Sequence, residues 1–411
     1  MSPKRPVNFS AVSQHLEETA FYWQQRQSGL WSPTFEKHDV DRIEDLIKAN
    51  LRGLRAAGDA VIEPAIENML RWHSAGGLFV LAWLAITTNS KKALGEIDGE
   101  LLQHPDLLFA AESALYAAEK TESLPMAKRW LGNTSAALRA ASIKLLIANS
   151  NDPTPIEAAL NDVDQRVAAR AIQAVGENRL SGFQNIVERL LDHVDPSCRI
   201  EAAISLRLFD GDDFSKTLIG AIDETLVSRS GALLSPREPE LAVIRRAIMC
   251  WSVVAEDSEF NEWVDDAISD DGKSREAVWA LAFRGTRAAL ERLADAAQNP
   301  ELRKLVGYAA VHITGVDLQR EGLLFEEGPD DAEDDVAVDA WIAEDDGLEG
   351  VDPERFGAWI ASYVSNLTSE ARLLNGSHIE KPALMELLES GWQPQRWNAR
   401  AWLAFEGVSP V

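Results

Sequence analysis

The chain has 411 residues, and 46% of them are apolar, enough to bury the cores of two or three domains or of one long repeat array. Its 40 basic and 66 acidic residues give a net charge of −26, so we expect it to bind neither nucleic acid nor an anionic membrane surface. The excess acid is local. Residues 321–354 hold 15 acidic and no basic residues, and the remaining 51 acidic and 40 basic residues carry only −11.

The N-terminal third is predicted to be helical. Two basic residues stand at the start without an apolar run behind them, so no signal peptide is expected. Residues 39–54 carry an apolar stripe at helical spacing, with Asp39 or Asp41 as N-cap. Residues 77–87 are apolar enough to predict a buried helix, and the run is about half a membrane span. We expect 1–104 to form a helical cap region.

Residues 105–318 repeat a unit in which a turn with Asp or Asn precedes an apolar helix. Asn133 and Asp162 occupy equivalent turn positions 29 residues apart, and the unit returns at Asp192. Arg275 and Arg303 open two later helices 28 residues apart. A helix pair with this period resembles HEAT repeats, whose pairs share a continuous core only when stacked. The prediction is an all-α fold, an α-α superhelix of the HEAT-like solenoid type.

Arginines near the start of the second helix of each pair are predicted to bond turn aspartates or helix carbonyls of the neighbouring pair, forming a ladder. These arginines are Arg166, Arg199, Arg275 and Arg303.

Residues just beyond the arginines would face the concave side of the solenoid, where mixed charge and aromatic anchors suit a protein partner. The candidate partner-binding residues are Arg170, Glu201, Arg246, Trp251 and Trp279. Thirteen tryptophans are present and most should be core, but we expect one of Trp251, Trp263 and Trp279 to be exposed.

The acidic run marks a change of character after residue 318. We interpret 319–352 as a flexible acidic linker, with a lid over the groove or an attractor of a basic partner as the alternative. The remainder, 353–411, is predicted to be a helical tail in which Trp397 and Trp402 lie on a helix that docks on the body.

The sequence carries no catalytic or metal-binding signature. His193 and Asp195 have the chemistry of half a metal site, but a histidine and an aspartate in a turn are the commoner arrangement. The acidic stretch 265–272 fails as a calcium loop, because Ala267 stands at its third position. Cys198 and Cys250 read as buried free thiols in a reducing compartment. We therefore expect a cytoplasmic protein that is not an enzyme and has no cofactor or metal.

Five strings carry a resemblance to a known family: HLEETAFYWQQR at 15–26, LRAAGDA at 54–60, ITGVDL at 313–318, PERFGAW at 353–359 and RLLNG at 372–376. Together they resemble a proteobacterial family of HEAT-repeat proteins encoded in type VI secretion gene clusters. The resemblance spans nearly the whole chain and brings no assigned catalytic activity. It implies an adaptor or chaperone that holds a secretion effector or spike-tip component before loading. The alternatives are an immunity or scaffold protein and a lyase-type enzyme on the same fold.

The role of the acidic run is testable by deleting residues 326–350 and measuring partner affinity at two salt concentrations. A lid or an attractor should change the affinity and its salt dependence, because charge–charge attraction is screened by salt. An affinity unchanged at both concentrations would leave only a passive, solvating loop.

Overall fold

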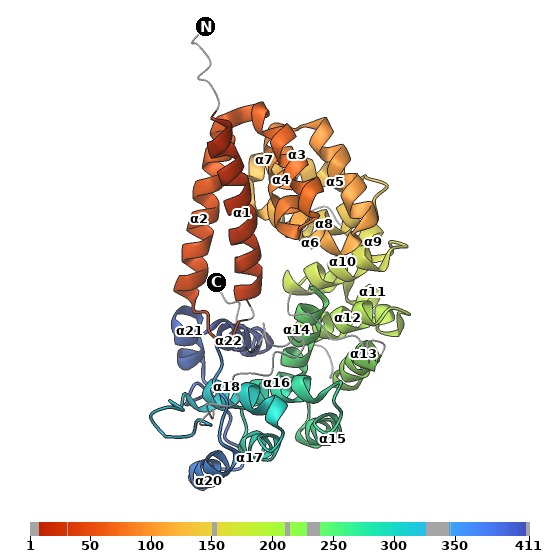
Figure 1. The fold of residues 1–411 in the computed structure, drawn as a ribbon. Coiled ribbons are helices and arrows are strands. Elements are labelled where there is room, and N and C mark those ends of the chain that lie inside the picture. Colours follow the sequence, from red (N-terminus) through yellow and green to blue (C-terminus); the bar gives the residue numbers. More distant parts are fainter. Residues whose placement is uncertain are drawn as a thin grey trace. The chain divides into compact units, whose positions relative to one another are not determined.

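The computed structural model describes residues 8–30, 32–149, 154–209, 214–227, 239–325, 345 and 347–407. Over these residues the fold is all-α, as predicted, with a single two-stranded hairpin (Figure 1). The chain forms two compact units. Unit 1 comprises Met1–Ser28 and His38–Phe209, and unit 2 comprises Gly29–Lys37 and Asp210–Val411.

The predicted regions, HEAT-like repeats at 105–318 and a helical tail at 353–411, follow periodicity and composition along the chain and stay a prediction. The repeats are shared between the two units, and the tail belongs to unit 2. The physical reason is that contacts between neighbouring helix pairs, rather than changes of composition along the chain, decide which segments share a core.

The α-helices of unit 1 are α1 (Phe9–Gly29), α2 (Lys37–Ala57), α3 (Ile62–Trp72), α4 (Ala75–Thr88), α5 (Lys91–Gln103), α6 (Leu108–Ala117), α7 (Lys120–Leu131), α8 (Ala136–Asn149), α9 (Thr154–Leu160), α10 (Gln165–Glu177), α11 (Gln184–Arg189) and α12 (Pro196–Leu208). Short 3₁₀ turns lie at Gly58–Val61, Pro105–Leu107, Ser181–Phe183 and Leu190–Asp192. The predicted helices at 39–54 and 77–87 are therefore confirmed as α2 and α4, and residues 76–86 of α4 are all buried.

The second helices of successive pairs pack against one another in chain order: α4 on α6, α6 on α8, α8 on α10 and α10 on α12. The first helices α3, α7, α9 and α11 each pack against the second helix that follows. The stack thus begins within residues 1–104, the region predicted to be a helical cap. Its early turns escaped detection because α4 and α5 are capped by Ser74 and Ser90 instead of the Asp or Asn of the later turns.

Small residues let these helices approach closely. A Cβ on Gly176 of α10 would lie 2.8 Å from the Cα of Ser205 on α12, closer than real Cβ atoms come. Gly76 of α4 meets the backbone of Ala20 on α1 in the same way, at 2.9 Å from its Cα. The predicted apolar stripe of α10, which includes Val167 and Ala171, is fully buried between its neighbours.

Unit 2 contains α13 (Ser215–Val227), α14 (Pro239–Val254), α15 (Asp257–Ala267), α16 (Ser274–Arg284), α17 (Arg287–Ala296), the 3₁₀ turn Pro300–Leu302, α18 (Arg303–Thr314), α20 (Pro353–Val364), β1 (Leu373–Leu374), β2 (Ser377–His378), α21 (Lys381–Ser390) and α22 (Gln393–Phe405). Here α13 pairs with α14, α15 with α16 and α17 with α18, and the second helices α14, α16 and α18 again stack in order. The predicted docking helix is α22, which packs on α14.

The β1–β2 hairpin, which the sequence reasoning missed, closes the ends of two second helices. Its turn is Asn375-Gly376, with φ of 51° and 77°, the left-handed pair that tight hairpins favour. The Leu373 N–H donates to Gly285 O after α16, and the Asn375 N–H donates to His312 O in α18, both at 2.8 Å. The hairpin therefore satisfies carbonyl groups that a helix C-terminus leaves without partners.

Most of the predicted acidic linker, residues 326–344 and 346, lies outside the described residues. Its two flanks are ordered, which corrects the prediction for them. Phe325 N–H donates to Gly350 O and Asp352 N–H to Leu323 O, both at 2.8 Å. Asp345 is buried and pairs with Arg275 at 2.5 Å. The two flanks are thus bonded to each other, and a deletion restricted to 326–344 would remove neither partner of the Arg275–Asp345 ion pair.

Among the described helices, none combines the length and the apolar character that crossing a membrane requires.

The close approach at Gly176 predicts that alanine destabilises the protein at this position, although alanine usually stabilises a helix relative to glycine. Gly176→Ala should destabilise the protein by about 1–3 kcal/mol, because the new methyl group overpacks the α10–α12 contact. Gly95→Ala on α5 is the matched control. Its Cβ would meet nothing within 4 Å, so it should stabilise by about 0.5–1 kcal/mol through helix propensity alone. Urea unfolding of both variants tests this, and equal stabilisation by both would contradict the close-contact account.

Candidate functional site

The five predicted partner-binding residues do not fall in one compact unit. Arg170 and Glu201 lie on α10 and α12 of unit 1, whereas Arg246, Trp251 and Trp279 lie on α14 and α16 of unit 2. Arg170 and Arg246 are half-buried, and Glu201 is buried.

The two tryptophans are core residues, which corrects their prediction as anchors for a partner. Trp251 is 0% exposed, stacks on Phe260, and donates its indole N–H to Ser215 Oγ at 2.9 Å. Trp279 is 1% exposed and stacks on Phe283. Both rings fill space between the helices of unit 2, so a partner that leaves the fold intact does not reach them. Trp263, the third tryptophan of this group, is only half-buried.

Arg170 is part of a polar network across the second helices of unit 1. Its guanidinium forms an ion pair with Glu112 of α6 at 3.2 Å and donates to Gln173 at 3.1 Å. Gln173 donates to Glu177 at 2.8 Å, and Glu177 pairs with Lys144 of α8 at 3.2 Å. The network adds charge–charge contacts to the apolar packing that already joins α6, α8 and α10.

Tyr116 of α6 stands at this network with 53% of its surface exposed. Partial burial, followed by the negative charges of Glu112 and Glu177, raises the pKa of its phenol, so the hydroxyl stays protonated and can donate a hydrogen bond. We call the group Glu112, Tyr116, Lys144, Arg170, Gln173 and Glu177 the second-helix face. It combines both signs of charge with an exposed aromatic ring.

The predicted arginine ladder exists only in part. Arg166 bonds Asp164 at the start of its own helix, and this hydrogen bond lowers the pKa of the carboxyl. The link between neighbouring pairs is made by Arg139, whose fork bonds Asp162 in the following turn at 2.8 and 2.9 Å. A bond of this kind between neighbouring pairs was predicted, but Arg139 is not among the four arginines that were predicted to make it.

The other arginines bond backbone carbonyls or the acidic segment. Arg199 donates to the carbonyls of His193 and Val194, at 2.7 and 3.0 Å, and Arg303 donates to Ala297 O at 3.2 Å. In these cases the guanidinium bonds the turn before its own helix and orders that turn.

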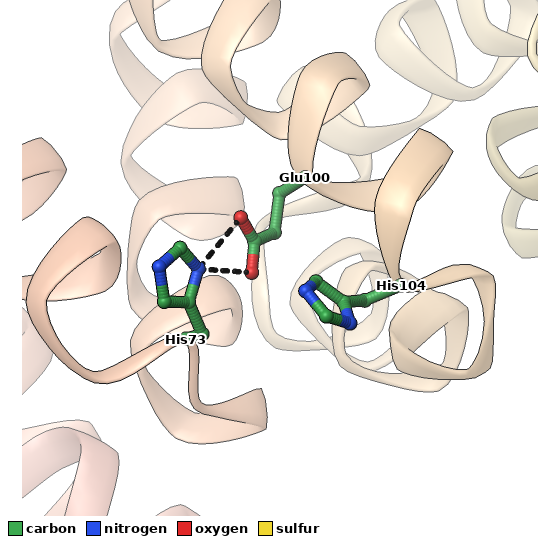
Figure 2. A group of neighbouring side chains, drawn as sticks. All are labelled: His73, Glu100 and His104. Carbon is green, nitrogen blue, oxygen red and sulfur yellow. Dashed lines mark hydrogen bonds and ion pairs between the residues drawn. The ribbon is translucent and has the colours of Figure 1, made fainter.

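A second cluster in unit 1 joins His73, Glu100 and His104 (Figure 2). His73 Nδ1 lies 3.0 and 3.1 Å from the two carboxylate oxygens of Glu100. The rings of His73 and His104 are 5.9 Å apart between centroids, and one ligand atom from each of the three residues falls within 4.8 Å of the others. Glu100 is 4% exposed, whereas both histidines are exposed.

Two helix ends position these groups. His73 follows α3 as its C-cap in the left-handed conformation (φ 43°, ψ 40°), and His104 follows α5 as its C-cap. Glu100 and His104 are four residues apart on and after α5, so they lie on the same side of that helix. The sequence analysis did not predict this cluster. The four-residue spacing of Glu100 and His104 is the part of the cluster that a sequence pattern could have predicted. His73 is brought to them by the tertiary fold.

A third histidine, His312 of α18, is fully buried in unit 2. The hydroxyl oxygen of Tyr308 lies 3.2 Å from its Nδ1, and the Asn398 side-chain amide nitrogen lies 3.2 Å from its Nε2. Burial lowers the pKa of this imidazole to about 3, so it is neutral in the folded protein. Because no part of the ring reaches solvent, His312 ties α22 to α18 instead of serving chemistry.

The remaining candidates have structural roles. The backbone N–H of Asp195 donates to His193 Nδ1 at 3.0 Å, which is a turn contact. Asp265 is bonded by Arg292 at 2.7 and 2.9 Å. Cys198 and Cys250 are buried free thiols, as predicted. Burial raises the pKa of the Cys198 thiol to about 12, so it holds no nucleophilic thiolate at neutral pH.

No protein-family model, curated protein or solved structure matches this chain.

The buried imidazole predicts a loss of stability in acid. Below its ordinary pKa of about 6.5, the unfolded chain binds a proton at His312 that the folded protein does not bind. Stability should therefore fall as the pH drops, by about 1.4 kcal/mol from this group between pH 7.5 and 5.5.

His312→Gln preserves an acceptor for Asn398 and a donor for Tyr308. It should reduce the change in the free energy of unfolding between pH 7.5 and 5.5, measured by urea unfolding, by about 1.4 kcal/mol. His378→Gln, on the exposed strand β2, is the control and should keep the wild-type dependence. Equal pH dependence in wild type and His312→Gln would show that this histidine is not held neutral.

Proposed function

We propose that the chain is a non-catalytic adaptor or chaperone that binds another protein, a type VI secretion effector or spike-tip component, before it is loaded. The partner class comes from the family resemblance of the five sequence strings. The mode of binding is proposed from the second-helix face. The proposed location is the cytoplasm, where secretion substrates are held before export.

The observation that carries the proposal is the composition of the second-helix face. Protein interfaces combine an aromatic anchor with charged groups around it, and Tyr is among the residues enriched at binding hot spots. Tyr116 is 53% exposed beside the Arg170–Glu112 and Lys144–Glu177 pairs. Ion pairs of this kind hold the charged side chains in place before binding, which reduces the entropy lost when a partner docks.

The net charge of −26 favours a partner with a basic surface. Complementary charge raises the rate of association and is weakened by salt. The adaptor would then shield a basic or apolar surface of the partner until loading.

The proposal is tested by affinity capture of the tagged protein from its own bacterium, followed by identification of bound proteins by mass spectrometry. We expect a spike component or effector, and we expect Tyr116→Ala to weaken its binding about 10-fold, the effect of losing about 1.4 kcal/mol at a hot spot. Phe21→Ala removes a comparably exposed aromatic ring, 59% exposed, from α1 and should leave binding unchanged.

Recovery of no secretion component at native expression, or equal binding by Tyr116→Ala and wild type, would contradict the proposal. The immunity alternative has a separate readout. An immunity protein protects cells from the toxin, whereas an adaptor promotes its export.

A further inference from the structure

We propose that His73, Glu100 and His104 form a zinc site that keeps one coordination position open to solvent. The donors are two imidazole nitrogens and one carboxylate oxygen, a set that suits Zn²⁺ with a water as the fourth ligand. This inference does not depend on the proposed adaptor function.

The geometry needs little adjustment to hold the ion. Zinc ligands lie about 2.0–2.2 Å from the metal, so neighbouring donors of a tetrahedral site are about 3.3 Å apart. His73 Nδ1 and the carboxylate of Glu100 already approach at 3.0 and 3.1 Å. The widest donor separation of the cluster is within 4.8 Å, so closing the site requires a shift of about 1–2 Å. His104 is exposed, so we assign this shift to a rotation of its side chain.

The electrostatics favour a cation at this point. Glu100 is 4% exposed, and burying a carboxylate is costly unless an opposite charge compensates it. In the part of the chain that the structure describes, its ion-pair partner is His73, which is charged only when protonated. The site also lies at the C-terminal ends of α3 and α5, where helix dipoles place negative potential. A divalent cation would satisfy the carboxylate and both helix ends.

The position of His104 favours a metal site over a simple histidine–carboxylate pair. The hydrogen bonds within the cluster join His73 to Glu100, and that pair does not need a second imidazole. His104 nevertheless faces the same point from α5, as Figure 2 shows. His73 reaches it from the C-cap of α3.

Zinc fits this donor set better than the hard cations do. Imidazole is a good ligand for zinc, whereas Ca²⁺ and Mg²⁺ are bound mainly by oxygen atoms and keep six or more ligands. Bound zinc would link the C-terminal ends of α3 and α5 in unit 1. Because both histidines are exposed, the fourth coordination position of the zinc is open to water or to a donor group from a partner.

The test is titration of the full-length protein, stripped of metal with a chelator, with zinc chloride by calorimetry. We expect one zinc ion per chain at this site and a higher thermal unfolding midpoint when zinc is present, because a ligand that binds only the folded state stabilises it. His104→Gln and Glu100→Gln should each weaken binding at least about 10-fold, since even losing a group that only hydrogen-bonds a zinc ligand costs that much. His38→Gln alters another exposed histidine beside a carboxylate, Asp39 at 3.4 Å, and should bind zinc as wild type does.

Circular dichroism of the metal-free variants confirms that each one folds. Cobalt(II) substituted for zinc should give the strong visible absorption of a four- or five-coordinate ion, and this absorption should be lost in His104→Gln. The proposal is overturned if wild type binds no zinc at millimolar concentration or if His104→Gln and Glu100→Gln bind it as tightly as wild type. Equal affinity for Ca²⁺ or Mg²⁺ would overturn the assignment to zinc.

Discussion

The close packing of successive second helices is the constraint on which the rest of this structure depends. A single helix pair cannot bury its apolar face, so each pair is stable only against its neighbours. That contact is tight: the backbone of α12 at Ser205 leaves no room for a side chain at Gly176 of α10. Small residues at the crossing therefore matter as much as the large apolar residues around it.

The turns between helices set the spacing of the stack. Asp164 and Asp195 cap the helices that follow them by accepting backbone N–H groups. The fork of Arg139 then bonds Asp162 of the next turn, so one guanidinium joins two repeats. A helix-capping device and an inter-repeat contact thus occupy the same few residues.

The stacking of the helices also determines which charged, aromatic and potential metal-ligating side chains lie together. With the apolar stripes buried, the second helices carry charge and the ring of Tyr116 on the second-helix face. The ends of α3 and α5 bring two histidines to one buried carboxylate. Large aromatic residues such as Trp251 and Trp279 are buried instead. They fill the space between helices, which explains why a count of tryptophans is a poor guide to a binding surface.

The sequence by itself determined the helical fold, the repeat with its Asp and Asn turns, and the buried stripe of α10, because helical periodicity and N-caps act over a few residues. It did not determine the two units, the ordered flanks of the acidic segment or the hairpin that covers α16 and α18. The same holds for the histidine cluster. Glu100 and His104 are neighbours by helical spacing, but His73 stands 27 residues before Glu100. Only packing of α3 against α5 brings it there, since contacts distant in sequence are set by the tertiary fold and leave no local pattern.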